Sequence, residues 1–283
     1  MDAFHYCDTL VRAADKVRFV SSLFAPAEQR KALFALYAFN VEITRVSELI
    51  REPLAGEIRL QWWRDLLAAS ARGDAEANPV AAALVAAKTQ HNLPADELRI
   101  MIEARRFDLY DEPMQSIDQL EQYAKSVSST LIALAARVLV GRGNATMSAM
   151  TDHAGIAYAI AGLLKAFPIH ARRRQIYLPL EVIERHGLTV SEVIERGAKS
   201  GLRAALAELR VLARAHLHKA GRLLPAVPAA AIPALLPVAV VAPTLARMEH
   251  RSYDPFVEID IPSWRRQWLI WRAARKPDRI FSV

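Results

Sequence analysis

Apolar residues recur along most of the chain with the period of an α-helix. Leu33, Leu36 and Val41 follow the spacing of three to four residues that places side chains on one helix face. The alanine-rich runs 80–88 and 131–140 favour helix and lack the apolar–polar alternation that is typical of strands. The pattern therefore predicts an all-α protein.

Prolines and glycines divide this helical pattern into segments. Pro26 and Pro94 stand where helices are expected to begin, because proline suits the first turn of a helix. Gly73-Asp74 and Gly141–Asn144 have the composition of turns between helices. No long linker, low-complexity tract or internal repeat separates these segments, so the helices are expected to pack together.

Length and composition allow a large core. The chain has 283 residues, is 53% hydrophobic and contains only 10 glycines. At ordinary helix lengths this predicts roughly a dozen helices. We expect one domain over residues 1–283, in which residues 250–283 form a C-terminal helical extension.

The charge balance and the single cysteine limit the classes of function. A net charge of +7 favours anionic partners, such as a phosphorylated ligand or an anionic membrane surface. The basic residues are spread along helical faces without interleaved aromatic residues, so we expect no nucleic-acid partner. Cys7 is the only cysteine, which excludes an intramolecular disulfide. The first twenty residues lack the apolar region of a secretory signal, so we expect a cytoplasmic protein.

Two segments near the C-terminus each allow two interpretations. Segment 223–246 is apolar but contains five prolines, so it is either a set of short packed helices or an edge that contacts a membrane. The run 264–272 combines Trp264, Trp268 and Trp271 with arginines. It is either a terminal helix docked on the bundle or a helix at a membrane interface, where tryptophan and arginine are favoured.

Two longer motifs point to a known family. Residues 35–48 read ALYAFNVEITRVSE, and residues 155–179 read GIAYAIAGLLKAFPIHARRRQIYLP. Both resemble the two signatures of the squalene/phytoene synthase family, with no gap in the second. Gln61–Arg64 and the Y-x-x-x-V-x-x-T pattern of 123–130 resemble further family segments, and Ile102–Leu109 resembles the region between the signatures. The resemblance covers roughly residues 5 to 250, and it implies an isoprenoid synthase-type helical bundle around a central cavity.

The motifs depart from the family at the positions that bind metal. In the family, each signature carries a D-x-x-x-D pair whose carboxylates hold Mg²⁺ and, through it, a prenyl diphosphate. Here Thr44 and Glu48 occupy the first pair, and Ala166 and His170 occupy the second. Mg²⁺ prefers oxygen ligands, and carboxylates above all, so one remaining carboxylate is a poor site. We therefore expect no catalytic residues, no metal site and no Mg²⁺ cofactor.

The loss of the metal-binding carboxylates implies that the protein acts by binding a partner or ligand. Residues 38–46 and 56–64 resemble the branch of the family that includes a mitochondrial complex I assembly factor. That resemblance implies a non-catalytic assembly or accessory factor for a membrane respiratory complex, peripheral on the inner membrane face. Its partners would be a respiratory-complex subunit and a prenyl or lipid ligand.

Four residues are expected to hold such a ligand, on the basis of their places in the motifs: Arg45, Arg172, Arg173 and Tyr177. Two alternatives remain open from the sequence. One is a prenyltransferase that couples prenyl diphosphates head to head with atypical metal ligands, and the other is a soluble isoprenoid- or lipid-binding protein. His216 and His218, two apart on an expected helix, are assigned ordinary surface roles.

Overall fold

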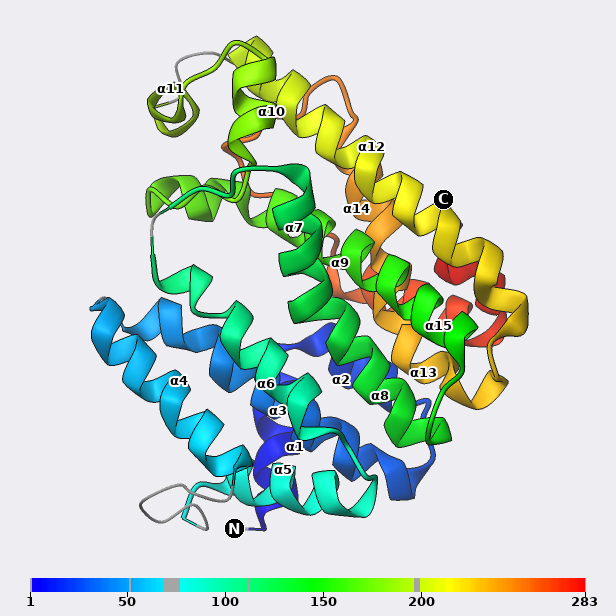
Figure 1. The fold of residues 1–283 in the computed structure, drawn as a ribbon. Coiled ribbons are helices and arrows are strands. Elements are labelled where there is room, and N and C mark those ends of the chain that lie inside the picture. The colour runs from blue at the N-terminus through cyan, green and yellow to red at the C-terminus, as the bar shows by residue number, and fades with distance from the viewer. Residues whose placement is uncertain (1, 51, 69–76, 111, 196–198, 283) are drawn as a thin grey trace.

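The computed structural model describes residues 2–50, 52–68, 77–110, 112–195 and 199–282, and these form a bundle of α-helices without a β-strand in that part of the chain (Figure 1). The turn expected at Gly73-Asp74 lies outside the described residues. The fold class predicted from the helical periodicity, all-α, is confirmed.

The first eight helices make up the N-terminal half of the bundle: α1 (Ala3–Ala14), α2 (Lys16–Ser22), α3 (Ala27–Leu49), α4 (Pro53–Leu67), α5 (Pro79–Gln90), α6 (Ala95–Ala104), α7 (Ile117–Ala124) and α8 (Thr130–Val140). The remaining helices follow: α9 (Ala145–Arg172), α10 (Leu180–Arg185), α11 (Val190–Ile194), α12 (Lys199–Leu223), α13 (Ile232–Leu235), α14 (Val241–Met248) and α15 (Ser263–Arg275). Short 3₁₀ segments at 107–109, 224–226, 229–231, 236–240 and 277–280 connect several of them, and a π-helical segment, η2 (Lys125–Ser129), joins α7 to α8.

The helix ends form where the local sequence offers a cap or a proline. Asn144 accepts a hydrogen bond from the backbone N–H of Met147 at the start of α9. Ser116 caps α7 in the same way, through the N–H of Gln119. Pro26 precedes α3 and Pro94 precedes α6, as their positions in the sequence predicted.

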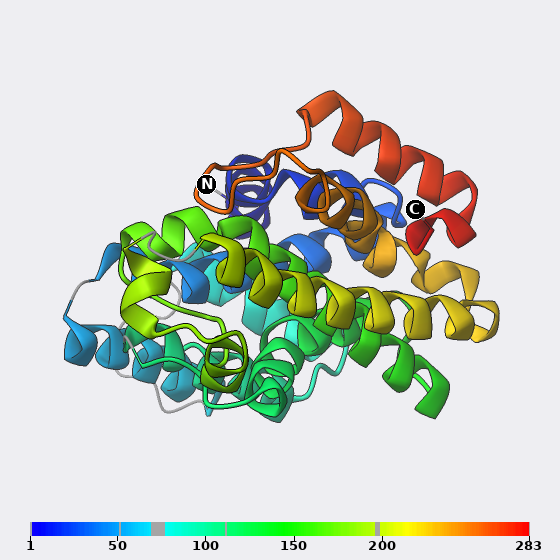
Figure 2. The same cartoon turned by 90° about the horizontal axis from the view of Figure 1, so that it is seen from above.

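The long helix α9 is the central element of the bundle. It packs along α12 and also contacts α8, α14 and η2 (Figures 1 and 2). On the other side of the molecule, α1, α3 and α5 pack against one another. Cys7 of α1 is fully buried in that packing. One continuous apolar core joins the two halves, because its side chains run from Cys7 to Ile280.

A close backbone contact fixes where α9 crosses η2. A Cβ atom built on Gly155 would lie 2.3 Å from the Cα atom of Ser129, closer than any side chain can approach. The Ser129 hydroxyl donates a hydrogen bond to the carbonyl oxygen of Asp152, one turn earlier in α9 (2.8 Å). Glycine at position 155 therefore allows the two helices to meet at backbone distance.

The proline-rich segment 223–246 forms short packed helices, as one of its two interpretations predicted. Pro225, Pro233 and Pro237 lie in the first turns of a 3₁₀ segment, of α13 and of another 3₁₀ segment. By length and composition, three helical stretches in the described part of the chain are apolar enough to cross a membrane, namely 117–140, 145–172 and 229–248. Within their most apolar windows, 67%, 61% and 72% of residues are buried inside the fold, so these stretches build the protein core.

Candidate functional site: a polar cavity between α3 and α9

A cavity of about 430 Å³ lies between α3 and α9. From α3, it is lined by Asn40, Thr44 and Glu48, whose four-residue spacing places them on one face. From α9, the lining includes Tyr158, Gly162, Ala166 and His170, which have the same spacing. Glu48 of α3 and His170 of α9 therefore line the same cavity.

Seven of the eight residues singled out from the motifs line this cavity: Thr44, Arg45, Glu48, Ala166, His170, Arg173 and Tyr177. The eighth, Arg172, lies outside it. The Arg172 side chain is 59% exposed and pairs with Glu258 on the molecular surface. Neighbours in sequence thus separate at the end of α9, because consecutive helical residues point in different directions.

One wall of the cavity is built around a buried carboxylate. Asp108 is 4% exposed and pairs with Arg105 (Nη1 to Oδ2, 3.1 Å). Its Oδ1 atom accepts hydrogen bonds from the phenols of Tyr123 (2.7 Å) and Tyr177 (2.8 Å). Burial and the adjacent Asp108 raise the pKa of Tyr177, so the phenol keeps its proton and remains a donor. Asp108 therefore ties Arg105, Tyr123 and Tyr177 together in this wall, and its negative charge is matched by the Arg105 guanidinium.

The cavity lining also holds a second neutralised pair, Asp15 and Arg18. Asp15 caps α2 through the backbone N–H of Arg18 (3.0 Å) and also accepts from the Arg18 guanidinium (2.6 Å). Arg18 is 8% exposed and lies over the ring of Tyr158, 4.9 Å from its centre. Burial alone would lower the pKa of Arg18, but Tyr158 and Asp15 raise it overall, so this arginine stays charged.

Two cations in the cavity lack such neutralisation. No ion pair is found for Arg45 or Arg173 within the described residues, although both line the cavity. Nearby, Asn40 Oδ1 and Thr44 Oγ1 are buried and have no hydrogen-bond partner in that part of the chain. A buried polar atom without a partner costs about 1–3 kcal/mol. The cavity therefore presents unmatched positive charge beside unmatched polar atoms, an arrangement that suits an anionic, hydrogen-bonding ligand.

His170 lines both this cavity and a small apolar space next to it. Its ring lies against that of Tyr177, with centres 4.6 Å apart. Burial lowers the pKa of His170 to about 4, with Asp108 opposing and Arg173 adding to the shift. The imidazole is therefore neutral at pH 7 and adds no charge to the site. Among the described residues, no hydrogen bond joins His170 to Glu48, although both line the cavity.

Behind this ring pair the lining becomes apolar and the space almost vanishes. Leu120, Ile160, Phe167 and Leu209 surround a volume of about 10 Å³, next to His170 and Tyr177. A single water needs about that much room. A ligand of the polar cavity therefore finds no room in this apolar space unless these side chains move.

The donor set does not fit Mg²⁺. Of the four motif positions that carry carboxylates in the family, only Glu48 does so here. The other cavity carboxylates, Asp15 and Asp108, already pair with arginines. Among the described residues, three or more His, Cys, Asp or Glu side chains are nowhere grouped so that they would hold a metal ion. The prediction that this protein uses no Mg²⁺ stays a prediction.

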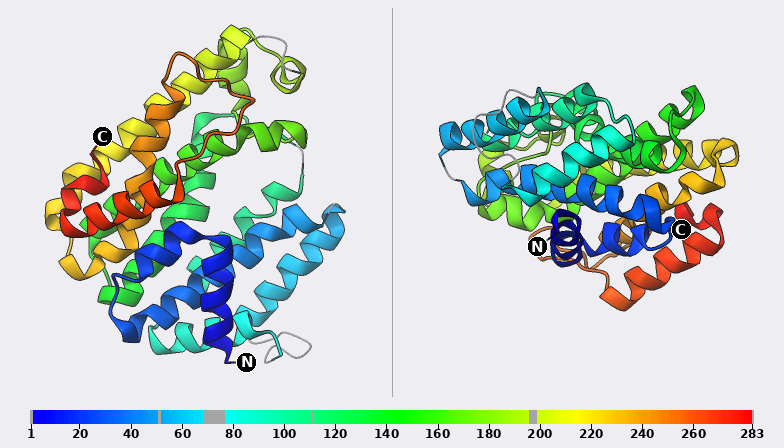
Figure 3. Two further views of the ribbon diagram at one scale, coloured as in Figure 1. Left: turned by 180° about the vertical axis from the view of Figure 1, so that it is seen from behind. Right: turned by 90° about the horizontal axis from the view of Figure 1, so that it is seen from below.

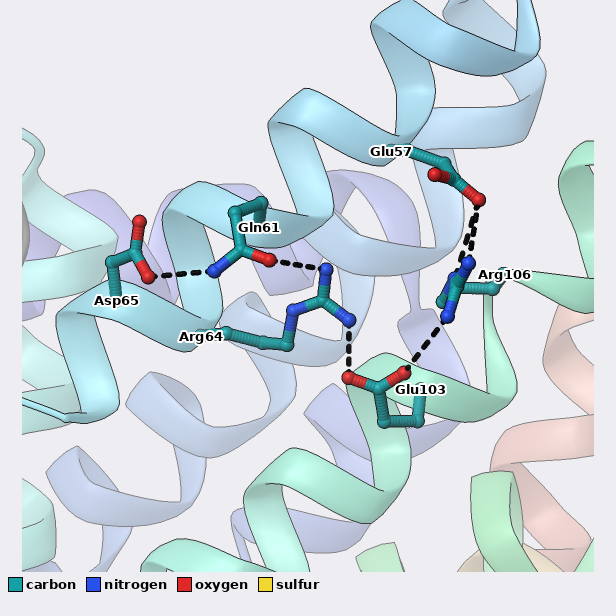
Figure 4. Close-up of polar contacts among 6 residues, drawn as sticks. All are labelled: Glu57, Gln61, Arg64, Asp65, Glu103 and Arg106. Atoms are coloured by element: carbon teal, nitrogen blue, oxygen red, sulfur yellow. Dashed lines mark hydrogen bonds and ion pairs between the residues drawn. The ribbon is translucent and has the colours of Figure 1, made fainter.

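The tryptophan-containing segment of α4 is held to α6 by a chain of polar contacts (Figure 4). Arg64 donates to Gln61 of its own helix and to Glu103 of α6. Glu103 also pairs with Arg106 (3.7 Å), and Arg106 forms a second ion pair with Glu57 of α4 (2.8 Å). The Q-W-W-R motif therefore fixes α4 against α6, and none of its four residues lines the cavity.

The assignment of His216 to the surface is wrong. His216 is 4% exposed, and its Nε2 lies 3.0 Å from Glu121 of α7. Its Nδ1 lies 3.0 Å from Nδ1 of His153 in α9. The side chain is buried because α12 packs along α9, and it bridges two helices there. His218, two positions later, is exposed as expected.

Sequence reasoning also missed four cavity residues: Asp15, Arg18, Asn40 and Arg105. Asn40 had a signal, since it precedes Thr44 by one helical turn. Asp15 and Arg18 had only the pattern of a helix cap with a basic residue three positions later. Nothing local showed that this cap would face α9, more than a hundred residues away.

Comparison with known proteins relates this geometry to a family. The family model for squalene/phytoene synthase matches residues 11–272. The chain is 31% identical over 279 residues to "NADH dehydrogenase (ubiquinone) complex I, assembly factor 6" from Rattus norvegicus, covering 94% of this chain and 84% of that protein. It is 26% identical over 211 residues to "15-cis-phytoene synthase" from Synechocystis sp., covering 68% and 60% of the two chains.

A solved structure shows the same fold. Squalene synthase HpnC from Alicyclobacillus acidocaldarius superposes with a TM-score of 0.76 at 23% identity, covering 90% of this chain and 95% of that one. The isoprenoid synthase-type bundle expected from the motifs is therefore confirmed. Because the family model spans nearly the whole chain and α3 and α9 frame the cavity, this protein belongs to the squalene/phytoene synthase family.

Proposed function

We propose that this protein is a non-catalytic assembly or accessory factor for respiratory complex I, and that its cavity binds one ligand with an anionic head group. The observation that carries the proposal is the composition of the cavity wall. It retains Arg45 and Arg173, for which the described residues supply no ion pair, whereas only Glu48 remains of the four motif carboxylates. The similarity to complex I assembly factor 6 along 94% of the chain supports the same role.

Electrostatics favour one anionic group over two diphosphates. An uncompensated charge is very costly to bury, and enzymes of this family offset the two diphosphates with metal ions. Here, Arg45 and Arg173 provide compensation for a single head group. A volume of about 430 Å³ is also at the lower end of the range, about 300–1,000 Å³, that encloses one small ligand.

The proposal places the protein at the inner face of a membrane without spanning it. The similarity to complex I assembly factor 6 suggests association with that complex, and the net charge of +7 on this chain suits an anionic surface. Its partners would then be a complex I subunit and a prenyl or other lipid ligand. No cofactor and no nucleic acid take part.

The assembly role is tested by removing the gene from its own cell. We expect complex I to be lost from native gels of the membrane fraction while the other respiratory complexes remain, and the intact gene to restore it. Normal complex I levels in the deleted strain would contradict the role and leave a soluble lipid carrier as the better account.

The ligand site is tested with farnesyl monophosphate as the probe, in calorimetric titrations without metal. Arg45→Ala and Arg173→Ala should each weaken binding about tenfold or more, because a charge-assisted hydrogen bond contributes about 1.5–3 kcal/mol. Arg172→Ala is the matched control, since Arg172 adjoins Arg173 in sequence but lies outside the cavity. Equal losses in all three variants would contradict this site.

The enzymatic alternative makes a distinct prediction. Incubation with farnesyl diphosphate and Mg²⁺ or Mn²⁺ should give no coupled product above a heat-inactivated control. The variant with Thr44→Asp, Glu48→Asp, Ala166→Asp and His170→Asp should bind prenyl diphosphate more tightly when Mg²⁺ is added, because it restores both carboxylate pairs. Coupling by the unmodified protein would favour a prenyltransferase with atypical metal ligands.

A further inference from the structure

Helix α15 presents one face to the core and the opposite face to solvent. Leu269, Ile270 and Ala273 are buried against the segments 236–240 and 16–22, with which α15 packs. Figures 2 and 3 show α15, in orange-red, at the periphery of the molecule near the N-terminal helices. Its docking on the bundle confirms one of the two interpretations of this segment, and its outer face remains to be explained.

The outer face carries the tryptophans. Trp264, Trp268 and Trp271 are 70%, 47% and 49% exposed. Their spacing of four and three residues aligns them along one stripe, on the side away from Leu269 and Ala273. A stripe of three exposed tryptophans is unusual for a surface in water, because each ring buries a large apolar area when it finds a partner.

The charges on this helix are all of one sign. Within Ser263–Arg275 there are four arginines and no carboxylate: Arg265, Arg266, Arg272 and Arg275. Arg272 lies over the ring of Trp268 (4.5 Å) and Arg275 over that of Trp271 (5.3 Å). Among the residues that the structure describes, Arg266 is the one arginine of this helix that pairs with an acid, Asp260.

A groove of about 980 Å³ runs along the flank of α15, bordered by Arg265, Trp268 and Arg272. Of the three carboxylates that line this groove, Asp254 accepts a hydrogen bond from the backbone N–H of Phe256, and the other two are neutralised by ion pairs. Asp260 pairs with Lys165 and Arg266, and Glu258 pairs with Arg172. The Nε atom of Arg272 is buried and has no hydrogen-bond partner in the described part of the chain. The flank therefore offers guanidinium groups to an anion beside the tryptophan stripe.

We propose that the outer face of α15, defined by Trp264, Trp268, Trp271, Arg265 and Arg275, binds the surface of a membrane that contains anionic phospholipids. Tryptophan rings favour the boundary between acyl chains and head groups, and basic residues nearby are attracted to anionic lipid. A helix that lies in this plane needs an apolar stripe flanked by cations, which is the arrangement on α15.

Charge separates this surface from the other exposed apolar patch. Leu49, Leu54 and Ile58, at the junction of α3 and α4, are 78%, 72% and 66% exposed. They lie close in sequence to the exposed carboxylates Glu48 and Glu52, and Arg51 between them lies outside the described residues. An anionic membrane attracts the arginines of α15, whereas acids and bases are mixed around the patch on α3 and α4. The patch on α3 and α4 therefore serves as the matched comparison.

The test uses the whole protein and flotation with vesicles of phosphatidylcholine, with or without three-tenths phosphatidylglycerol. We expect binding to the mixed vesicles, a blue shift of tryptophan emission, and quenching by lipids brominated near the head of the acyl chain. Trp264→Ser, Trp268→Ser and Trp271→Ser together should lower partitioning by about tenfold or more. Arg265→Gln should lower it about fivefold, and raised salt should weaken binding of the unmodified protein.

The control variant combines Leu49→Ser, Leu54→Ser and Ile58→Ser, and it should float as the unmodified protein does. Circular dichroism and thermal unfolding establish that each variant is folded. Binding that survives loss of the three tryptophans, or that disappears in the control variant, would overturn the proposal. A failure of the unmodified protein to bind any vesicle would also overturn it. If, in addition, the tryptophan variant no longer associated with complex I, the face would be assigned to a protein partner. Cavity titrations with farnesyl monophosphate are independent of this outcome, so the two proposals fail separately.

Discussion

The properties of single residues in the cavity depend on whether each charge has a partner within hydrogen-bonding distance. Asp108 pairs with Arg105, and Asp15 pairs with Arg18, whereas Arg45 has no ion pair among the described residues. The first two pairs support the walls, and Arg45 is left for a ligand. Asp108 and His170, which both line the cavity, each lead to a prediction.

Asp108→Asn should destabilise the fold strongly. The change removes the charge opposite the buried Arg105 and leaves an uncompensated cation, which typically costs about 3–5 kcal/mol. Urea unfolding measures the difference in the free energy of unfolding. The matched control is Asp96→Asn, because Asp96 is 86% exposed and its pair with Arg99 lies at the surface. That variant should remain within about 0.5 kcal/mol of the unmodified protein.

His170 should make stability depend on pH. Its pKa is about 4 in the folded state and about 6.5 when unfolded, so between these values the unfolded chain binds more protons. Stability is therefore lost as the pH falls from about 6.5 to 4, by up to about 3 kcal/mol from this group. Urea unfolding at several pH values should show a smaller loss for His170→Gln than for the unmodified protein. The exposed His218→Gln should leave the loss unchanged, and an identical pH profile for both variants would contradict the assignment.

At the scale of helices, most of the fold could be predicted from the sequence. The period of the apolar residues gave the helices, and Pro26, Pro94 and Asn144 mark ends that the structure confirms. The two cavity helices were identified because their motifs resemble a known family. These signals are local or depend on shared spacing, so a single sequence contains them.

Contacts between distant helices could not be predicted in this way. His216 is buried because Glu121 and His153, 95 and 63 positions away, reach it from two other helices. Likewise, Arg18 belongs to the cavity only because α2 brings it to Tyr158 of α9. Helical period gives the face on which a residue lies, but it does not give the helix that covers that face.

The crossing of α9 over η2 leads to a prediction for two glycines of the same helix. Gly155→Ala should destabilise the protein by about 3 kcal/mol, because its Cβ atom would overlap the backbone of Ser129. Gly162→Ala should stabilise it by about 0.5–1 kcal/mol, since nothing lies within 4 Å and alanine favours helix. Chemical denaturation of the two variants measures both effects. Equal effects would mean that α9 does not approach η2 so closely.

For the whole molecule, the continuous core predicts a single unfolding transition. Core side chains extend from Cys7 in α1 to Ile270 in α15 and Ile280 beyond it. Ile270→Ala should lower the melting temperature of that one transition by about 5–10 °C, with the exposed Gln267→Ala as the control. Calorimetry that resolves two transitions, with only one shifted by the Ile270 change, would show that the C-terminal segment folds as a separate unit.

The burial of Cys7 has a practical consequence. Its thiol is fully enclosed where α1 meets α3 and α5, and burial, together with Asp2 and Glu42, raises its pKa to about 12. A thiol-directed reagent reacts with the thiolate, so the native chain should be almost inert to it. Because the chain has no other cysteine, every labelling event would record an opening of α1. The natural sequence therefore carries its own reporter of transient opening, readable by mass spectrometry in cells or after lipid binding without any engineered probe.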